Sequence, residues 1–177
     1  ALGYELKIAP DAIRETLKTF EGVKRRFQNK GEIGGVLVVD DYGHHPTEIA
    51  ATLQTAKALD RKRLIAVFQP HRYSRTQQLL QEFGPSLKEA DEIVLTDIYA
   101  ASEDPIAGIT LEALADAVRS GAKKPVHLAR RLDDVVSTVV SLARPGDAVI
   151  TLGAGSIGTV PATVSAVSPG RISGHTS

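Results

Sequence analysis

Four short polar clusters contain most of the residue types in this chain that could bind a ligand or do chemistry. They are DDYGHHP (40–46), PHRYSR (70–75), IYAASEDP (98–105) and GAGSIG (153–158). The first cluster combines carboxylates, a tyrosine and two adjacent histidines, and the second places two arginines beside a histidine. Carboxylates and imidazoles bind metals, whereas the planar arginine fork donates paired hydrogen bonds to carboxylates and phosphates. The clusters therefore raise metal, nucleotide and anion binding as candidate functions.

The double histidine, His44 and His45, does not by itself predict a metal site. Zinc takes three or four separated ligands, and adjacent side chains on an extended or turning backbone point in different directions. The start of an N-capped helix accounts for residues 46–48. It leaves Asp41 and Tyr42, together with His44, as candidates for binding. Because the chain has no cysteine, thiol chemistry and cysteine-based zinc sites are excluded, and we expect no metal site.

The second cluster, with His71, Arg72 and Arg75, predicts a clamp for a carboxylate or phosphate. The alternative is a helix entrance whose arginines are simply solvated. GAGSIG is similar to a phosphate-binding glycine turn, but the chain has no P-loop motif with its lysine. A loop that binds the phosphates of ATP would therefore have to lie outside this chain.

Each cluster follows an apolar run of strand length. The runs 35–40, 64–69, 92–97 and 147–153 are rich in Val, Ile and Leu without clean alternation, which is typical of strands buried on both faces, and 125–129 is a weaker fifth. Helical patterns lie between the runs, at 46–59, 75–90, 110–119 and 131–143, and another lies at 10–19. This alternation predicts an α/β fold, a doubly wound and mostly parallel sheet with helices on both faces. Ligands bind such sheets at the carboxyl ends of the strands, so we expect the four clusters to form one site.

Composition argues against several classes of partner. The chain of 177 residues has 21 acidic and 21 basic residues, so it lacks the positive charge of a typical nucleic-acid binder. No apolar stretch approaches the roughly 20 residues that span a bilayer, and the first residues do not have the pattern of a signal peptide. We expect a cytoplasmic protein that binds neither nucleic acid nor membrane. The absence of any methionine indicates a piece of a longer protein.

Taken in order, GVKRRF (22–27), DDYGHHPTEI (40–49), FQPHRYSRT (68–76), DIYAASEDPI (97–106) and GAGSIG resemble the C-terminal part of the Mur ligases. The resemblance covers roughly residues 2–165 and is greatest to the members that add L-alanine to UDP-N-acetylmuramate. The ligase that recycles murein tripeptide is similar around the double histidine. The resemblance implies a Rossmann-like C-terminal domain at 33–165, preceded at 1–32 by the end of the central ATPase domain and a linker. Residues 166–177 are expected to be a disordered or cloning-derived tail.

The resemblance also implies roles for individual residues, carried over by position. Four are expected at the nucleotide: Arg26, Asp41, Tyr42 and His44. Three are expected near the carboxylate of the incoming L-alanine: His71, Arg72 and Arg75. No residue is assigned a catalytic role.

The implied reaction uses ATP and magnesium to convert the carboxylate of UDP-N-acetylmuramate into an acyl phosphate, which the amino group of L-alanine attacks. The N-terminal and central domains of such an enzyme would be required. We therefore expect this chain alone to be inactive and to hold neither ATP nor magnesium. Two other functions stay open from the residues: a stand-alone module that binds a nucleotide or small anion, and a metal hydrolase that uses the double histidine.

Overall fold

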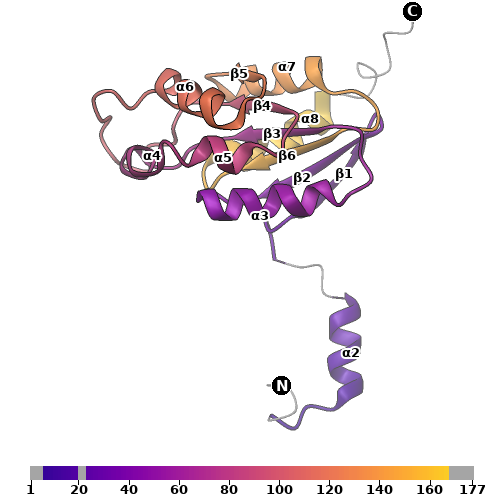
Figure 1. The fold of residues 1–177 in the computed structure, drawn as a ribbon. Coiled ribbons are helices and arrows are strands. Elements are labelled where there is room, and N and C mark those ends of the chain that lie inside the picture. Colours follow the sequence, from indigo (N-terminus) through magenta and orange to yellow (C-terminus); the bar gives the residue numbers. More distant parts are fainter. Residues whose placement is uncertain (1–5, 20–22, 168–177) are drawn as a thin grey trace, which may run out of the picture.

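The apolar runs of the sequence form the strands of one six-stranded sheet. The computed structural model describes residues 6–19 and 23–167 (Figure 1). The strands are β1 (Gln28–Ile33), β2 (Val36–Asp41), β3 (Leu64–Phe68), β4 (Glu92–Leu95), β5 (Val126–Leu128) and β6 (Ala148–Leu152). Their order in the sheet is β1-β2-β6-β3-β4-β5, with β1 antiparallel to β2 and every other pair parallel. The predicted strands are thus confirmed.

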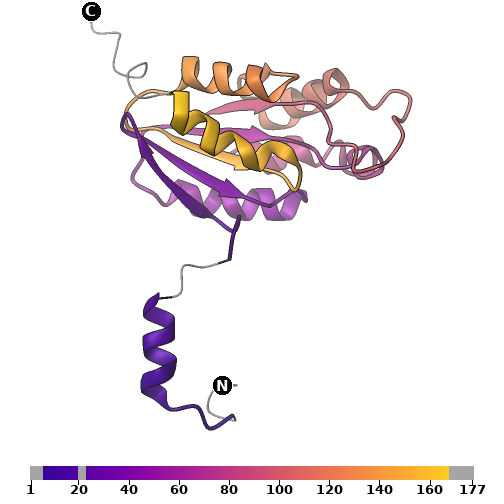
Figure 2. The same cartoon turned by 180° about the vertical axis from the view of Figure 1, so that it is seen from behind.

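Side chains of the central strands alternate between two apolar cores. In β3, Leu64, Ala66 and Phe68 belong to the core that α3, α5 and α6 cover, whereas Ile65 and Val67 belong to the core under α7 and α8. Figures 1 and 2 show these two sets of helices on opposite faces of the sheet. The helices are α2 (Pro10–Thr19), α3 (Pro46–Lys57), α4 (Tyr73–Leu79), α5 (Phe83–Leu87), α6 (Leu111–Ala122), α7 (Leu132–Leu142) and α8 (Val160–Val167), and a 3-10 turn, η1, spans Ser156–Thr159. The doubly wound α/β fold with helices on both faces is confirmed.

One predicted helix, 75–90, is two helices in the structure. The chain is helical in α4, leaves the helix after Leu79 and resumes in α5. The reason is Pro85, which has no backbone N–H and whose ring would clash with the carbonyl of residue 81 in a continuous helix. Because Pro85 lies in the first turn of α5, it is tolerated there.

The edge strand β1 is absent from the sequence-based expectation. Its residues, QNKGEI, are mostly polar and exposed, and a bulge interrupts its pairing with β2 between Asn29 and Gly31. Residues 28–32 nevertheless form a hairpin with β2. The boundary predicted between residues 32 and 33 therefore falls inside this hairpin, and the sheet begins before it.

A helix lies near each end of the described chain. Figures 1 and 2 show α2 apart from the sheet, and α8 packs against α7. The first two residues of the predicted tail, 166 and 167, are the end of α8, while residues 168–177 lie outside the described residues. Within the described ranges, no helix is both long and apolar enough to cross a membrane.

Candidate functional site

Four aromatic rings from three loops form a continuous row at the carboxyl ends of the parallel strands. We call Tyr42, His44, His71 and Tyr99 the ring row. Tyr42 meets His44 edge-on at 5.6 Å between centroids, His44 lies 5.7 Å from His71, and His71 stacks on Tyr99 at 5.4 Å. The loops after β2, β3 and β4 supply these rings. The expectation that the polar clusters converge at one edge of the sheet is therefore confirmed for these three loops.

The second histidine of the pair, His45, caps helix α3. Its Nδ1 accepts a hydrogen bond from the backbone N–H of Thr47 at 3.3 Å. Glu48 folds back, and its Oε2 accepts from the N–H groups of His44 and His45 at 3.0 and 3.2 Å. Burial raises the pKa of Glu48, but these N–H groups, with the nearby His44 and Arg26, outweigh that effect and hold its pKa below the ordinary value. His45 is thus explained by helix capping.

The first histidine, His44, faces the site instead. Its Nδ1 lies 3.1 Å from the carbonyl oxygen of Tyr42. Because a carbonyl can only accept, this contact requires the proton on Nδ1, and Nε2 of the neutral ring is then an acceptor. The local backbone therefore fixes the tautomer of a ring that is in contact with both Tyr42 and His71.

The predicted arginine clamp lies at the start of α4. The Nη1 atom of Arg75 donates to the carbonyl of His71 at 3.2 Å and lies 3.3 Å from its Nδ1. Arg72 has an exposed side chain, and its Nη1 lies 3.7 Å from the Glu103 carboxylate. That carboxylate accepts from the N–H of Ser74 at 2.9 Å and from its hydroxyl at 2.7 Å. The loop after β4 thereby holds the start of α4, where Arg72 is the N-cap and Arg75 lies in the first turn.

The surroundings of His71 lower its pKa below the ordinary histidine value. Partial burial is the largest cause of its lowered pKa, followed by the charges of Arg75, His44 and Arg72, and the opposing effect of Glu103 is smaller. A neutral imidazole adds no positive charge beside these two permanent cations, and its Nδ1 can accept the hydrogen bond of Arg75 Nη1.

The lowered pKa of His71 predicts a pH dependence of stability. Protonation is harder in the folded than in the unfolded chain, so His71 favours unfolding once the pH falls below about 6.5, the ordinary histidine value. We expect His71→Gln to reduce the loss of unfolding free energy between about pH 7.5 and about pH 5.5, measured by urea denaturation. The exposed substitution Gln77→Asn should leave that loss unchanged. An equal loss in His71→Gln and the unsubstituted chain would contradict the prediction.

Asp41 was predicted at the nucleotide, but both of its carboxylate oxygens already accept hydrogen bonds from backbone N–H groups. Its side chain is buried, and its Oδ1 accepts from the N–H of Gly43 and its Oδ2 from that of Phe27, both at 2.7 Å. The carboxylate therefore joins the segment before β1 to the loop after β2. Its structural role is to hold that loop, and with it Tyr42, at the end of the strand.

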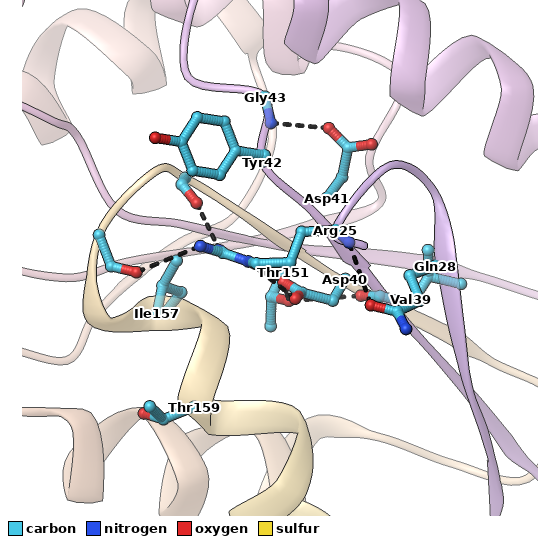
Figure 3. A network of polar contacts seen from close by, with 12 residues as sticks. Arg25, Gln28, Val39, Asp40, Asp41, Tyr42, Gly43, Thr151, Ile157 and Thr159 are labelled. Carbon is cyan, nitrogen blue, oxygen red and sulfur yellow. Dashed lines mark hydrogen bonds and ion pairs between the residues drawn. The ribbon is translucent and has the colours of Figure 1, made fainter. Parts of the chain in front are cut away.

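Two adjacent arginines before β1 have different environments. The side chain of Arg26, the predicted nucleotide residue, is 54% exposed, lies 3.7 Å from Glu48 and has its guanidinium 5.9 Å from the centroid of the Tyr42 ring. Arg25, to which the resemblance assigned no role, turns inward to the buried Asp40 (Figure 3). The backbone of Arg25 is in the left-handed region, with φ +57°.

The GAGSIG loop closes this edge of the sheet rather than cradling a phosphate. The carbonyls of Gly153 and Gly155 accept from Arg25, at 2.6 Å from Nη2 and 3.5 Å from Nη1. The N–H of Ile157 donates to Gln69, and a Cβ at Gly155 would lie 2.6 Å from the Tyr99 ring. Because carbonyl oxygens repel anions, a loop that directs them at a cation is poorly suited to phosphate.

The described part of the site has no group of metal ligands, and the cavity beside it is lined by other residues. Within residues 6–19 and 23–167, no three His, Asp or Glu side chains are grouped so that they could hold a metal ion. A cavity of about 650 Å³ lies beside the site, between Tyr73, the loop 105–111 and Arg130. None of the predicted site residues lines it.

Residues 25–155 match the family described as Mur ligase, glutamate ligase domain. A UDP-N-acetylmuramate–L-alanine ligase from Syntrophus aciditrophicus is 50% identical over 160 residues, which are 90% of this chain and 33% of the relative. This chain spans about a third of the length of the curated relatives that it matches.

Solved structures give the same picture of the fold. A UDP-N-acetylmuramate–alanine ligase from Thermotoga maritima superposes with a TM-score of 0.74 at 27% identity, covering 92% of this chain and 34% of the other. A murein peptide ligase from Psychrobacter arcticus superposes with a TM-score of 0.66 at 23% identity, covering 92% and 33%. At that lower identity the likeness concerns the fold alone.

Proposed function

This chain belongs to the Mur ligase family, and we propose that it is the amino-acid-binding domain of an ATP-dependent ligase that joins L-alanine to UDP-N-acetylmuramate. The observation that carries the proposal is the convergence of the ring row with Arg72 and Arg75 at the carboxyl ends of the parallel strands. Fifty per cent identity to an L-alanine ligase supports the choice of amino acid. The whole ligase would contain further domains, because the relatives are about three times as long.

The nucleotide would lie against Arg26, Tyr42 and His44. Tyr42 is 38% exposed and its ring adjoins the exposed Arg26 guanidinium, so the pair offers a flat surface and a cation. ATP would supply the phosphoryl group that activates the substrate carboxylate. Asp41 would serve the nucleotide indirectly, by holding the loop that carries Tyr42.

L-Alanine would be bound through its carboxylate by Arg75, with Arg72 and His71 beside it. One nitrogen of Arg75, Nη1, is fixed on His71. Among the described residues, Nε and Nη2 of Arg75 have no polar partner, so they can form the two parallel hydrogen bonds that a carboxylate accepts. A neutral His71 would place no further positive charge beside the amino group of alanine.

Magnesium would be held in the full-length enzyme chiefly by the phosphates of ATP and by residues outside this chain. It usually binds through one or two carboxylates together with substrate phosphates and water, and the described residues contain no group of three His, Asp or Glu side chains that could hold it on their own. We therefore assign this domain no step through magnesium.

The domain limits follow from the sheet. We propose that the C-terminal domain comprises residues 25–165. This range adds to 33–165 the strand β1, which pairs with β2, and the preceding residues Arg25 and Phe27, which bind Asp40 and Asp41 of β2. Helix α2 would belong to the end of the preceding ATPase domain, since it lies apart from the sheet (Figure 1).

The test is an ADP-release assay with UDP-N-acetylmuramate and L-alanine. The full-length ligase that contains this chain should turn over, and the purified 177-residue chain should not. Turnover by the chain alone would contradict its assignment as one domain of a larger enzyme. Replacing L-alanine by murein tripeptide in the same assay distinguishes the recycling ligase, which would prefer the tripeptide.

A stand-alone nucleotide-binding module is the second candidate, because Tyr42 and Arg26 are exposed on this chain without any other domain. It predicts measurable affinity of the isolated chain for ATP in calorimetric titration. The ligase assignment predicts weak or no binding until the other domains complete the site.

A further inference from the structure

Arg25 forms a buried ion pair at the centre of the site's supporting network. Its side chain is 23% exposed and that of Asp40 is 1% exposed, with 2.9 Å between Nε and Oδ2. The hydroxyl of Thr151 in β6 donates to the other oxygen of Asp40 at 2.8 Å. The pair thus connects the segment before β1 with two central strands, β2 and β6 (Figure 3).

Arg25 holds Tyr42 through both its backbone and its side chain. The Arg25 carbonyl accepts from the N–H of Tyr42 at 2.7 Å. The Arg25 guanidinium lies 5.3 Å from the centroid of the Tyr42 ring, within the distance of a cation–π contact. Tyr42 is at one end of the ring row. A change in the position of Arg25 should therefore move the Tyr42 ring relative to His44.

Only an arginine can make these contacts together. Its Nε binds Asp40 while its Nη2 donates to the Gly153 carbonyl at 2.6 Å, and the same planar group faces the ring of Tyr42. A lysine ammonium is a point charge without that flat surface. Gly158 makes room for the group, because a Cβ there would lie 2.5 Å from the Arg25 Cζ.

We propose that Arg25 is a positioning residue that sets the Tyr42 ring for the nucleotide, through its simultaneous contacts with Asp40, the Gly153 carbonyl and Tyr42. Gly158 has the complementary role of leaving space for the guanidinium. The nucleotide part of this inference rests on the proposed ligase function, whereas the control of the Tyr42 ring does not.

The positioning role is tested on the 177-residue chain without any ligand. Arg25→Ala would leave Asp40 buried and unpaired and could unfold the protein, so two milder variants are used. Arg25→Lys keeps the charge, and Gly158→Ala displaces the guanidinium without changing any charge. Both should shift the NMR signals of the Tyr42 ring and speed the exchange of its amide proton, with the ring signals of Tyr73 unchanged. Unmoved Tyr42 signals in both variants would overturn the positioning role.

The nucleotide part is tested by steady-state kinetics of the full-length ligase. Loss of one cation–π contact should raise KM for ATP about fivefold in each variant, with kcat changed less than about twofold. In a Tyr42→Ala background the same substitutions should have no further effect on KM for ATP. Arg119→Lys, on the exposed surface of α6, is the control and should behave like the unsubstituted enzyme. Shifted Tyr42 signals with an unchanged KM for ATP would overturn the nucleotide assignment while leaving the positioning of the ring intact.

Discussion

Replacing Arg75 by alanine in the full-length ligase should raise KM for L-alanine about 10- to 100-fold, the loss expected when a charged hydrogen-bond donor to a carboxylate is removed. The physical reason is the anchoring of one guanidinium nitrogen on His71, which directs the remaining donors to the ligand. Steady-state kinetics at varied L-alanine and saturating ATP provide the measurement. KM for ATP should change little, because the nucleotide is assigned to other residues.

Two further variants make this result specific. Arg75→Lys keeps the charge but loses the paired donors. Its KM for L-alanine should therefore lie between that of Arg75→Ala and that of the unsubstituted enzyme. Arg119→Ala removes an exposed arginine from α6 and should leave both Michaelis constants unchanged. An unaltered KM for L-alanine in Arg75→Ala would remove Arg75 from the amino-acid site.

Replacing Asp41 by alanine should lower the unfolding free energy of the 177-residue chain by about 3–5 kcal/mol, since a buried charged acceptor of two hydrogen bonds is lost. The N–H groups of Phe27 and Gly43 would be left without that partner. Urea denaturation followed by circular dichroism measures the effect. Asp104→Ala, at an exposed loop position, should change the unfolding free energy by less than about 0.5 kcal/mol.

The same substitution separates a structural role from direct ligand binding. Asp41→Asn keeps one acceptor and should lose less stability than alanine. If Asp41→Ala were as stable as the unsubstituted chain, with its only effect on ATP use by the full ligase, the carboxylate would serve the nucleotide directly. The structure favours a loss of stability in Asp41→Ala, because both carboxylate oxygens of Asp41 already have backbone partners.

The sequence predicts the parts of the fold that hydrophobicity controls. The strands β2, β3, β4 and β6 are apolar on both faces, so their runs are evident, and the position of the polar loops at one edge follows from the parallel topology. β1 is not evident, because a solvated edge strand such as QNKGEI needs no apolar face. β1 is a strand because it pairs with β2 in the folded chain, and its own residues do not indicate that pairing.

The direction in which a side chain points is the other property that the sequence does not supply. Arg25 and Arg26 are identical in type and adjacent, yet one is paired with the buried Asp40 and the other is exposed. His44 and His45 differ in the same way, one in the ring row and one capping a helix. The partners that decide these cases, Asp40 for Arg25 and the N–H of Thr47 for His45, are brought close only by the folded chain.

The strand order has a consequence for synthesis on the ribosome. β6, which leaves the ribosome last of the six strands, lies between β2 and β3, and these two do not pair with each other. A nascent chain that ends before residue 148 therefore lacks the strand that joins the β1–β2 hairpin to β3–β4–β5. Insertion of β6 joins them and brings Thr151 to Asp40 in the same step. The sheet is therefore continuous, and the support beneath Arg25 and Tyr42 complete, only once β6 is in place.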